Sequence, residues 1–335
     1  MIGQVQSACS MEFATDRRSS SLSFAQEFAA SVIAVARTPL KTFEFSIDAQ
    51  KVAAGKHFDI TKASSRLVAN DGLVVLYCDH ASTVSIAPGL CALWCPLRGD
   101  LSISEAGSRL SVPKGSAYIA DTNRRYDAAL SATGACLAIV GSQLTWSAIN
   151  AFSNDGQADV PAIFPAVHSH SPMQRRALIA FARQCFTDAK RQSIARQISM
   201  VSTVVRQLQR GFDEQIDRCP GRTIARRRSV FLRLQRARLY ILLHNAKEMD
   251  VPMLANIASY SPWQFIKIFN QVFGKTPYAY LSQYRVEVAK MLLKNGKMMG
   301  VSEIARAAGF SSRSTFTRTM KQTIGTCATE FRAGT

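Results

Sequence analysis

Two groups of aromatic, polar and basic residues lie near the end of the chain at helical spacing. The first group is Trp263, Gln264, Ile266, Lys267 and Asn270, and the second is Arg313, Ser314, Thr317, Arg318 and Lys321. Residues three or four positions apart share one face of a helix, so each group is predicted to form an outward stripe. Arginine can donate two hydrogen bonds to guanine, and an apolar side chain can meet the methyl group of thymine. The chemistry that these residues offer is non-covalent recognition of DNA bases.

The residues around each stripe predict the same supporting structure twice. The two copies span residues 252–274 and 301–325, and most equivalent residues are 51 positions apart. Such a repeat indicates one supersecondary unit used twice. Each copy begins with a predicted short helix, over Met253–Ser259 or Ser302–Ala308, and continues through a turn into the helix that carries the stripe. This arrangement is a helix-turn-helix, whose second helix enters the major groove.

Serine residues open the second helix of each copy. Ser261 and Ser312 are predicted N-caps, because a serine hydroxyl accepts a hydrogen bond from a free N–H group at a helix start. Gly309 suits a turn that needs positive φ. Helix N-termini attract anions, so we expect DNA phosphates to be held by the helix starts together with Ser261, Ser311 and Ser312.

A buried face is predicted opposite each stripe. It comprises Phe265, Ile268, Phe269 and Val272 in the first copy, and Phe316, Thr319, Met320 and Thr323 in the second. Between the copies, a helix over Pro277–Lys294 is predicted, with a length of about 27 Å. One turn of DNA measures about 34 Å, so both units can read one face of the duplex.

The segment over residues 229–332 resembles the DNA-binding domain of AraC/XylS-type transcription regulators. The second copy carries the more specific signature, IA…GF-S-S-x-S-x-F-x-R over Ile304–Arg318, followed by Gly325 and the closing Phe331-Arg332. The resemblance implies a regulator that binds double-stranded DNA at a promoter or operator. It also implies RNA polymerase as a partner.

The distribution of charge agrees with a polyanionic partner. The 335 residues carry a formal net charge of +18. Residues 1–170 hold 13 Lys and Arg against 14 Asp and Glu, whereas residues 171–335 hold 28 against 9. An excess confined to the half with the repeats is typical of a phosphate-binding surface.

A strand-rich region precedes the helical part of the chain. Between Lys41 and Val140, short apolar segments are separated by turn signals, which predicts an antiparallel β sandwich or barrel. The candidate strands are Thr42–Ile47, His57–Lys62, Leu73–Cys78, Thr83–Ile86, Cys91–Cys95, Leu101–Ser104, Leu110–Val112, Ala117–Asp121, Tyr126–Leu130 and Cys136–Val140. In pattern and position this region resembles the cupin-like sensory domain that often precedes an AraC-type DNA-binding domain.

The predicted fold class is a multidomain α+β protein, with a β sandwich or barrel, a helical linker and an all-α double helix-turn-helix domain. The expected parts are 1–40 (a tail and a helix over Leu22–Ala36), 41–150 (a sensory or dimerisation domain), 151–224 (a linker and a helical hairpin) and 225–335 (the DNA-binding domain). Predicted helices after the strands are Pro172–Ala189, Ser193–Gln215 and Phe231–Leu243. The first two of these can also pair with a second copy of the chain.

Histidine and cysteine residues give little support for an enzyme. The five His are at positions 57, 80, 168, 170 and 244, and the one HxH motif, His168-Ser169-His170, lies in a predicted connector with no Glu just behind it. None of the eight Cys forms a CxxC pair, and most lie in apolar runs, which predicts buried reduced thiols. We expect no catalytic residue, no metal and no cofactor.

Three alternatives stay open. A metal-dependent cupin needs the histidine cluster that is missing, and a DNA-repair alkyl acceptor needs an activated cysteine in a Cys-His-Arg cluster, which the sequence does not show. The third alternative is an architectural DNA binder without a ligand, but a strand-rich first domain favours sensing or dimerisation.

The sequence therefore predicts a sequence-specific transcription regulator, namely an activator that responds to a small effector through its N-terminal domain. The expected partners are double-stranded DNA, RNA polymerase, a small-molecule effector and a second copy of the chain. No apolar run reaches the roughly 18–20 residues of a membrane span, and the start has no signal-peptide layout. We expect a soluble bacterial protein in the cytoplasm, associated with the nucleoid.

Overall fold

A computed structural model describes residues 46–60, 72–121, 124–152, 163–187, 194–244, 249–295 and 299–333. The strands are β1 (Ser46–Val52), β2 (His57–Asp59), β3 (Gly72–Cys78), β4 (Thr83–Ile86), β5 (Leu90–Arg98), β6 (Leu101–Glu105), β7 (Ser108–Val112), β8 (Ser116–Asp121), β9 (Tyr126–Leu130), β10 (Ala135–Ser142) and β11 (Ala166–Ser169). The helices are α5 (Gln143–Phe152), α6 (Pro172–Thr187), α7 (Ile194–Gln209), the 3₁₀ turn η1 (Arg210–Phe212), α8 (Asp213–Asp217), α9 (Ile224–Leu243), α10 (Val251–Ile257), α11 (Pro262–Phe273), α12 (Pro277–Asn295), α13 (Val301–Ala307), α14 (Arg313–Ile324) and α15 (Ala328–Ala333). The helix expected over Leu22–Ala36 lies outside the described residues.

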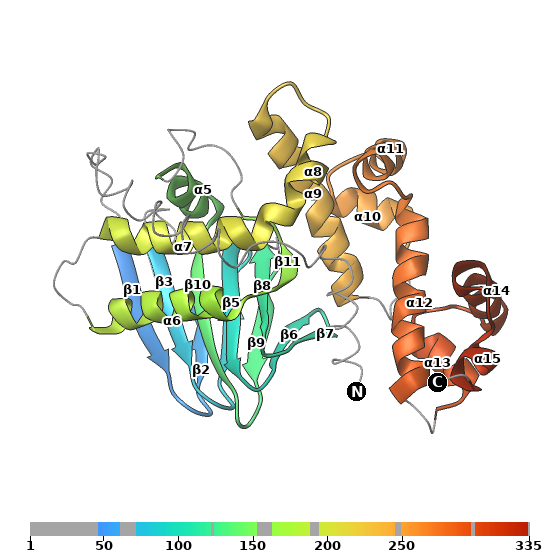
Figure 1. The fold of residues 1–335 in the computed structure, drawn as a ribbon, viewed down its shortest axis with the longest axis horizontal. Helices are drawn as coiled ribbons and strands as arrows, with labels where there is room; N and C mark the ends of the chain where they lie inside the picture. Colours follow the sequence, from blue (N-terminus) through green and yellow to red (C-terminus); the bar gives the residue numbers. More distant parts are fainter. Residues whose placement is uncertain are drawn as a thin grey trace.

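The strands form two sheets that face each other (Figure 1). One sheet has the order β1-β3-β10-β5-β8-β11, and the other has the order β2-β4-β9-β6-β7. The predicted sandwich is confirmed, but it is not antiparallel throughout, since β1 pairs with β3 and β2 pairs with β4 in parallel. Parallel neighbours need a crossover connection, and the chain supplies one because consecutive strands β1 and β2 join different sheets.

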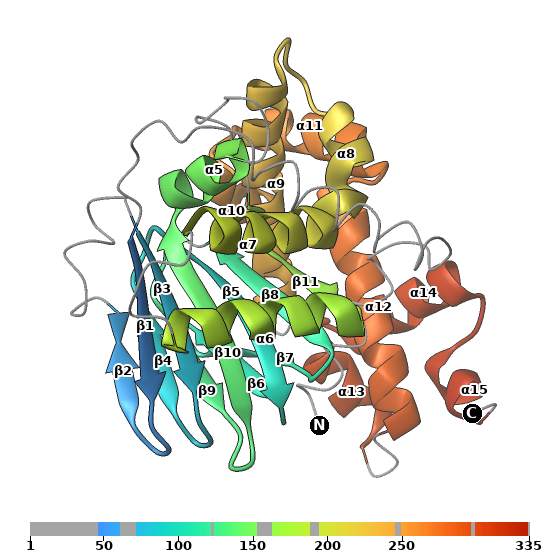
Figure 2. The same ribbon diagram turned by 60° about the vertical axis from the view of Figure 1, so that its left-hand side comes forward.

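The six-stranded sheet is covered on both faces. Along β5, Trp94 lies in the core between the two sheets, whereas Leu93 and Cys95 lie in the core shared with the helices. The core shared with the helices includes Phe181 of α6 and Val204 of α7. These two helices cross the outer face of the six-stranded sheet (Figure 2). Strands that are buried on both faces read as continuous apolar runs, which explains the unbroken apolar character of β5 and β10.

Two predictions about the connecting region were wrong. The sequence predicts a linker at the start of the 151–224 segment, over residues 151–171, but Ala166–Ser169 forms β11 and pairs with β8 at the edge of the six-stranded sheet. His168 is therefore a buried strand residue rather than part of a connector. The single helix predicted over Ser193–Gln215 is divided into α7, η1 and α8, because Gly211 falls within η1 and interrupts the regular helix.

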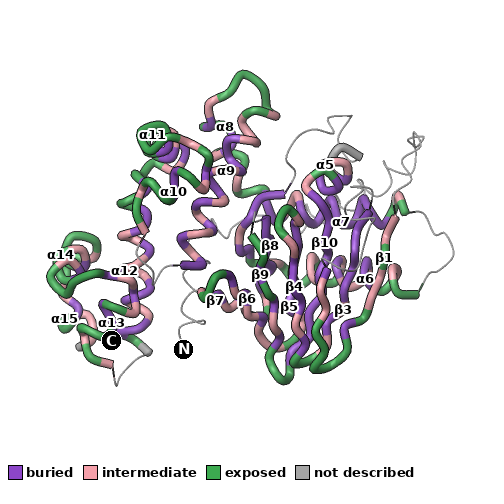
Figure 3. The backbone as a smooth tube through the Cα atoms, turned by 180° about the vertical axis from the view of Figure 1, so that it is seen from behind, coloured by how far each residue is buried: buried purple, intermediate pink, exposed green. Residues whose placement is uncertain are grey.

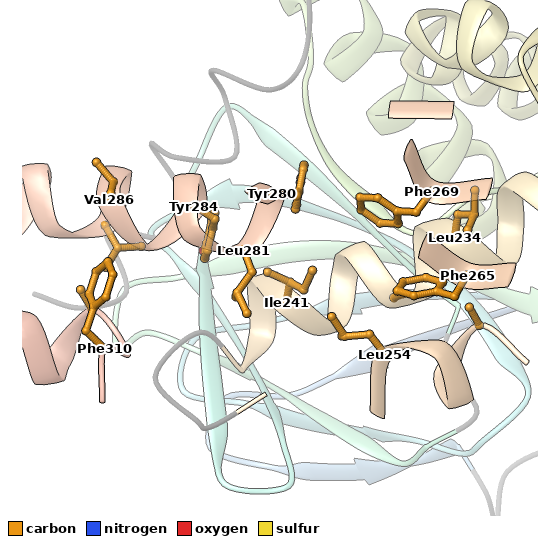
Figure 4. Packing of buried hydrophobic residues seen from close by; sticks show 14 of the residues in the cluster. Leu234, Ile241, Leu254, Phe265, Phe269, Tyr280, Leu281, Tyr284, Val286 and Phe310 are labelled. Carbon is orange, nitrogen blue, oxygen red and sulfur yellow. The ribbon is translucent and has the colours of Figure 1, made fainter. Parts of the chain in front are cut away.

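The helices from α9 to α15 share one core. Phe265 and Phe269 of α11 pack near Tyr280 of α12 and Leu254 of α10 (Figure 4). The helix α9 also reaches the sandwich, since Leu239 and Leu243 belong to the core between the sheets. Figure 3 shows α9 and α12 as largely buried or half-buried, whereas α11 and α14 have long exposed faces.

The cysteine thiols of the described residues are unpaired. Cys78, Cys91, Cys95, Cys136 and Cys219 are buried, as predicted, while two further thiols are half-buried. In the described part of the chain, no helix has the length and apolar character needed to cross a membrane.

Candidate nucleic-acid interface

Both predicted second helices are capped by serine. The hydroxyl of Ser261 accepts from the backbone N–H of Gln264 at 3.4 Å, and the hydroxyl of Ser312 accepts from that of Thr315 at 3.2 Å. Both helices end at a left-handed glycine, Gly274 at φ 69° or Gly325 at φ 79°. Matching caps at both ends give α11 and α14 the same length of 12 residues.

The turns before these helices are built alike from different residues. The backbone N–H of Tyr260 donates to the carbonyl of Ala255, and that of Phe310 donates to the carbonyl of Ala305, both at 2.9 Å. The preceding residue takes positive φ in each turn, but it is Gly309 in the second unit and a serine, Ser259 at φ 56°, in the first. The two turns are therefore equivalent, and the extra residue of the second unit follows them.

The buried faces agree with the predicted helical periodicity, with one exception. Phe265, Phe269 and Val272 are fully buried in α11, and Phe316 and Met320 are fully buried in α14. Thr323 was expected on the buried face but is exposed, because the neighbouring Ile324 packs against the core instead.

The predicted contact residues are exposed and form two separate sets. The first set, on or next to α11, is Ser261, Trp263, Gln264, Ile266, Lys267 and Asn270, and the second, on or next to α14, is Ser311, Ser312, Arg313, Ser314, Thr317, Arg318 and Lys321. The exposed fraction of Trp263 is 71%, which is high for so large an apolar side chain. The sets lie toward opposite ends of α12 (Figure 1), whose 19 residues correspond to about 28 Å.

Several of these side chains contact each other. The ammonium group of Lys267 lies over the ring of Trp263, 5.2 Å from its centroid, which holds the cation on an exposed apolar surface. The hydroxyl of Thr317 donates to the carbonyl of Arg313 within α14. Among the described residues, no acidic side chain forms an ion pair with Lys267, Arg313 or Arg318, so their charge is available to an anionic partner.

A buried ion pair joins α9 to the sandwich. Arg236 donates from Nε and Nη2 to the carboxylate of Asp121 on β8, at 3.0–3.2 Å, and the Asp121 side chain is 2% exposed. Burial raises the pKa of Asp121, and the Arg236 guanidinium opposes that rise. Nearby, the imidazole of His244 shares a hydrogen bond with the hydroxyl of Ser108 on β7. The segment that carries the interface is thus attached to the sandwich by polar as well as apolar contacts.

One arrangement of residues that the sequence did not predict bears on the alkyl-acceptor alternative. The Sγ of Cys95 lies 3.7 Å from Nε2 of His170, and the positive charge of Arg175 on α6 acts to lower the pKa of the Cys95 thiol. Burial nevertheless raises the pKa of Cys95 to about 12, so the reactive thiolate is disfavoured. Within the described residues, no three His, Cys, Asp or Glu side chains are grouped as a metal site would require.

Comparison with known proteins gives matches to the C-terminal part of the chain. The family described as "Helix-turn-helix domain" matches residues 254–334. A probable transcription factor of Proteus vulgaris, PqrA, is 35% identical over 91 residues, which are 27% of this chain and 73% of PqrA. The chain belongs to the AraC-type family of transcription regulators.

Longer AraC-type relatives match over a smaller share of their length. The probable transcriptional regulator LumQ of Photobacterium leiognathi is 30% identical over 93 residues, 28% of this chain and 37% of LumQ. The virulence regulon transcriptional activator VirF of Yersinia enterocolitica is 40% identical over 68 residues, 20% of this chain and 25% of VirF. The AraC-type DNA-binding segment is therefore what these proteins share with the chain.

Two contacts that position the AraC-type segment could not be found from the sequence. Gln271 on α11 donates to the carbonyl of Arg218 at 2.8 Å, across 53 positions, and Arg236 reaches Asp121 across 115 positions. Each pair consists of common polar residues with no local motif. The helix was predicted over Phe231–Leu243, whereas α9 begins at Ile224, and the sequence gave no indication of its partners in the sandwich.

Proposed function

We propose that the chain is a sequence-specific activator of transcription, in which α11 and α14 enter successive major-groove segments of one operator. DNA binding follows from the family, and the proposal adds the residues that perform it. The observation that carries it is the pair of serine-capped helices with exposed stripes, in which Lys267, Arg313 and Arg318 form no ion pair with an acidic side chain of the described residues. Such cations can fork a guanine or neutralise a phosphate.

The two helices are expected to contribute differently. The stripe of α11 offers the apolar surfaces of Trp263 and Ile266 beside one cation, which favours thymine methyl groups. The stripe of α14 offers Arg313, Arg318 and Lys321. Phosphate contacts release counterions, so α14 would account for more of the salt dependence of binding.

The division of the chain forms part of the proposal. Residues 41–150 would act as a sensory or dimerisation domain for a small effector, to which β11, α6 and α7 of the 151–224 segment are added, and residues 225–335 would act as the DNA-binding domain. The attachment of α9 to the sandwich through Asp121 and Arg236 gives an effector a physical route to the DNA-binding helices. RNA polymerase and a second copy of the chain would be the protein partners, in the bacterial cytoplasm at the nucleoid. The name of VirF, a transcriptional activator, supports activation rather than repression.

Selection of bound DNA from a random pool, followed by equilibrium binding, tests this function. Lys267→Ala and Arg318→Ala should each weaken binding to the selected site by about 1–3 kcal/mol if they read bases. Arg176→Ala is the matched control, because Arg176 is an exposed arginine on α6, which covers the sandwich. Its effect should stay below about 0.5 kcal/mol. Wild-type affinity in both Lys267→Ala and Arg318→Ala would show that the assignment to the groove is wrong.

A further inference from the structure

One arginine of α9 contacts both the end of α11 and the start of α12. The Nε of Arg238 donates to the hydroxyl of Tyr280 at 3.1 Å. Its guanidinium carbon also lies 4.6 Å from the ring centroid of Phe273 and 5.3 Å from that of Tyr280. A planar guanidinium can stack on one ring while it donates to a neighbouring hydroxyl, which a lysine cannot reproduce. Arg238 therefore links Phe273, the last residue of α11, to the first turn of α12.

The joint between α11 and α12 is short and aromatic. Gly274, at φ 69°, ends α11, and α12 begins at Pro277. The Phe273 ring lies 4.6 Å from the Phe269 ring within α11 and, across the joint, 6.4 Å from the Tyr280 ring, between centroids. Figure 4 shows Phe269 and Tyr280 close together at this end of α12. The angle between the two helices is thus fixed by ring packing and by the arginine that rests on the rings.

A small change in this angle has a large effect on the second unit. The helix α14 is carried toward the far end of α12, which is about 28 Å long. A rotation of about 10° at the joint would displace the far end of α12 by about 5 Å, from that length. The rise of one base pair is about 3.4 Å. The angle at the joint therefore determines the distance along the duplex at which α14 meets the groove.

The same arginine is connected to the sandwich. The Nη1 of Arg238 donates to Oε1 of Gln235 at 2.8 Å, and the Gln235 side chain, which is 2% exposed, donates to the carbonyl of Pro165 at 3.4 Å. Pro165 directly precedes β11, the edge strand of the larger sheet. A small pocket between β11, α9 and α12 is lined by His168, Gln235, Arg238 and Tyr280, among others. A displacement of β11 would therefore reach Arg238 through Pro165 and Gln235.

We propose that Arg238 is a positioning residue that fixes the spacing between the two recognition helices, and that β11 acts on this spacing through Gln235. The consequence is a preferred spacer length between the two half-sites of the operator. This inference rests on the proposed reading of DNA by both α11 and α14.

The test compares spacer preference among variants of the full chain. Binding is measured by fluorescence anisotropy on the selected operator and on operators with one base pair inserted or removed between the half-sites. One base pair moves the second half-site by about 3.4 Å and rotates it by roughly 34°, since one turn holds about 10.5 base pairs. The wild-type chain should lose affinity about tenfold for either change, which corresponds to about 1.4 kcal/mol. In Arg238→Met, this loss should fall to about threefold or less.

Two further variants separate positioning from general stability. Tyr280→Phe removes only the hydroxyl that Arg238 contacts, and it should give an intermediate loss of spacer discrimination. This variant keeps the test decisive if Arg238→Met fails to fold. Arg233→Met is the matched control, since Arg233 lies on α9 with its guanidinium 5.4 Å from the ring centroid of Tyr260, away from the joint. It should keep the tenfold discrimination of the wild-type chain.

The outcomes are distinct. An overall loss of affinity that is equal for all spacers in Arg238→Met and Tyr280→Phe would overturn the positioning role, as would unchanged behaviour in both variants. If the wild-type chain binds its selected operator but does not distinguish the spacers, simultaneous reading by two helices is wrong and the inference fails with it. Discrimination in the wild-type chain that is lost in the variants of the joint but kept in Arg233→Met supports the inference.

Discussion

Loss of Arg236 should destabilise the protein more than loss of its partner does. The Asp121 side chain is 2% exposed and accepts from Arg236 and from Nε2 of Gln143, whereas the Arg236 side chain is 24% exposed. Arg236→Met leaves a carboxylate buried without its counter-charge, which typically costs about 3–5 kcal/mol. In Asp121→Asn, the amide oxygen can still accept, and the arginine can turn toward water. We expect that variant to lose about 1–2 kcal/mol.

The pH dependence gives this prediction a second signature. Burial already raises the pKa of Asp121 in the native protein, and Arg236 opposes the rise. In Arg236→Met this opposition is absent, so the pKa rises further. A carboxyl group with a raised folded-state pKa adds stability at low pH, and this contribution is lost as pH rises through that pKa. The deficit of Arg236→Met should therefore be smaller at pH 5 than at pH 7.

Urea unfolding at both pH values measures these differences. The buried indoles of Trp94 and Trp146 report on the sandwich through their fluorescence, while circular dichroism reports on the helices. Arg125→Met is the matched control, because Arg125 pairs with Asp59 at 3.1 Å but is 53% exposed, and such pairs contribute about 0–1 kcal/mol. A loss in Arg236→Met no larger than in this control, or one that is independent of pH, would refute the reasoning.

Three further predictions concern His168 in β11, Ser259 in the turn before α11, and a fragment that contains α9 without the sandwich. Burial lowers the pKa of His168 to about 4 from its usual 6.5, so the neutral ring adds stability that is fully present above pH 6.5 and lost as pH falls toward 4. Urea unfolding should show the advantage of the wild-type chain over His168→Phe shrinking by about 3 kcal/mol over that interval, and parallel pH profiles would contradict this. Ser259→Gly should raise the free energy of unfolding by about 0.5–1 kcal/mol, because φ is 56° there, and a lower melting temperature would argue against strain in the turn. A fragment of residues 225–335 should be helical and should bind the selected DNA more weakly than the full chain. It would expose Leu239 and Leu243, so polar substitutions at both should reduce its aggregation in light scattering; binding without sequence preference would count against it.

The sequence predicted the helical part well because its signals are local. Apolar periodicity, the caps Ser261 and Ser312 and the closing glycines all lie within a few residues of the elements that they define. The positive φ of Ser259 was missed for the same reason, since no local signal marks it. Gly309 indicated positive φ in the second turn. Ser259 takes the same conformation in the first turn without a glycine, because the hydrogen bond from Tyr260 to Ala255 is equivalent to that from Phe310 to Ala305.

The arrangement of the sandwich could not be predicted in the same way. Most strands were located from short apolar segments between turn signals, but these signals do not tell which strands pair, and the parallel contacts of β1 and β2 depend on a crossover between sheets. The strand β11 has only four residues and lies between prolines, so it resembled a loop until its pairing with β8 was known. The bond from Arg236 to Asp121 spans 115 positions and leaves no trace in either segment.

The contacts of α9 suggest which part of the DNA-binding surface a signal from the sandwich would reach first. The first unit is braced by several neighbours, since the Arg238 guanidinium lies on the Phe273 ring at the end of α11 and Gln271 of α11 bonds to the carbonyl of Arg218. Arg238 belongs to α9, which is bonded to the sandwich through Arg236, and Arg218 directly follows α8. The second unit packs against α12 and is closed by Arg332, which donates to the carbonyl of Met299. A change in the sandwich would therefore move α11 together with α9, and it would reach α14 through the angle of α12. Under the proposed function, regulation of this kind would alter the match between protein and operator without altering α11 or α14.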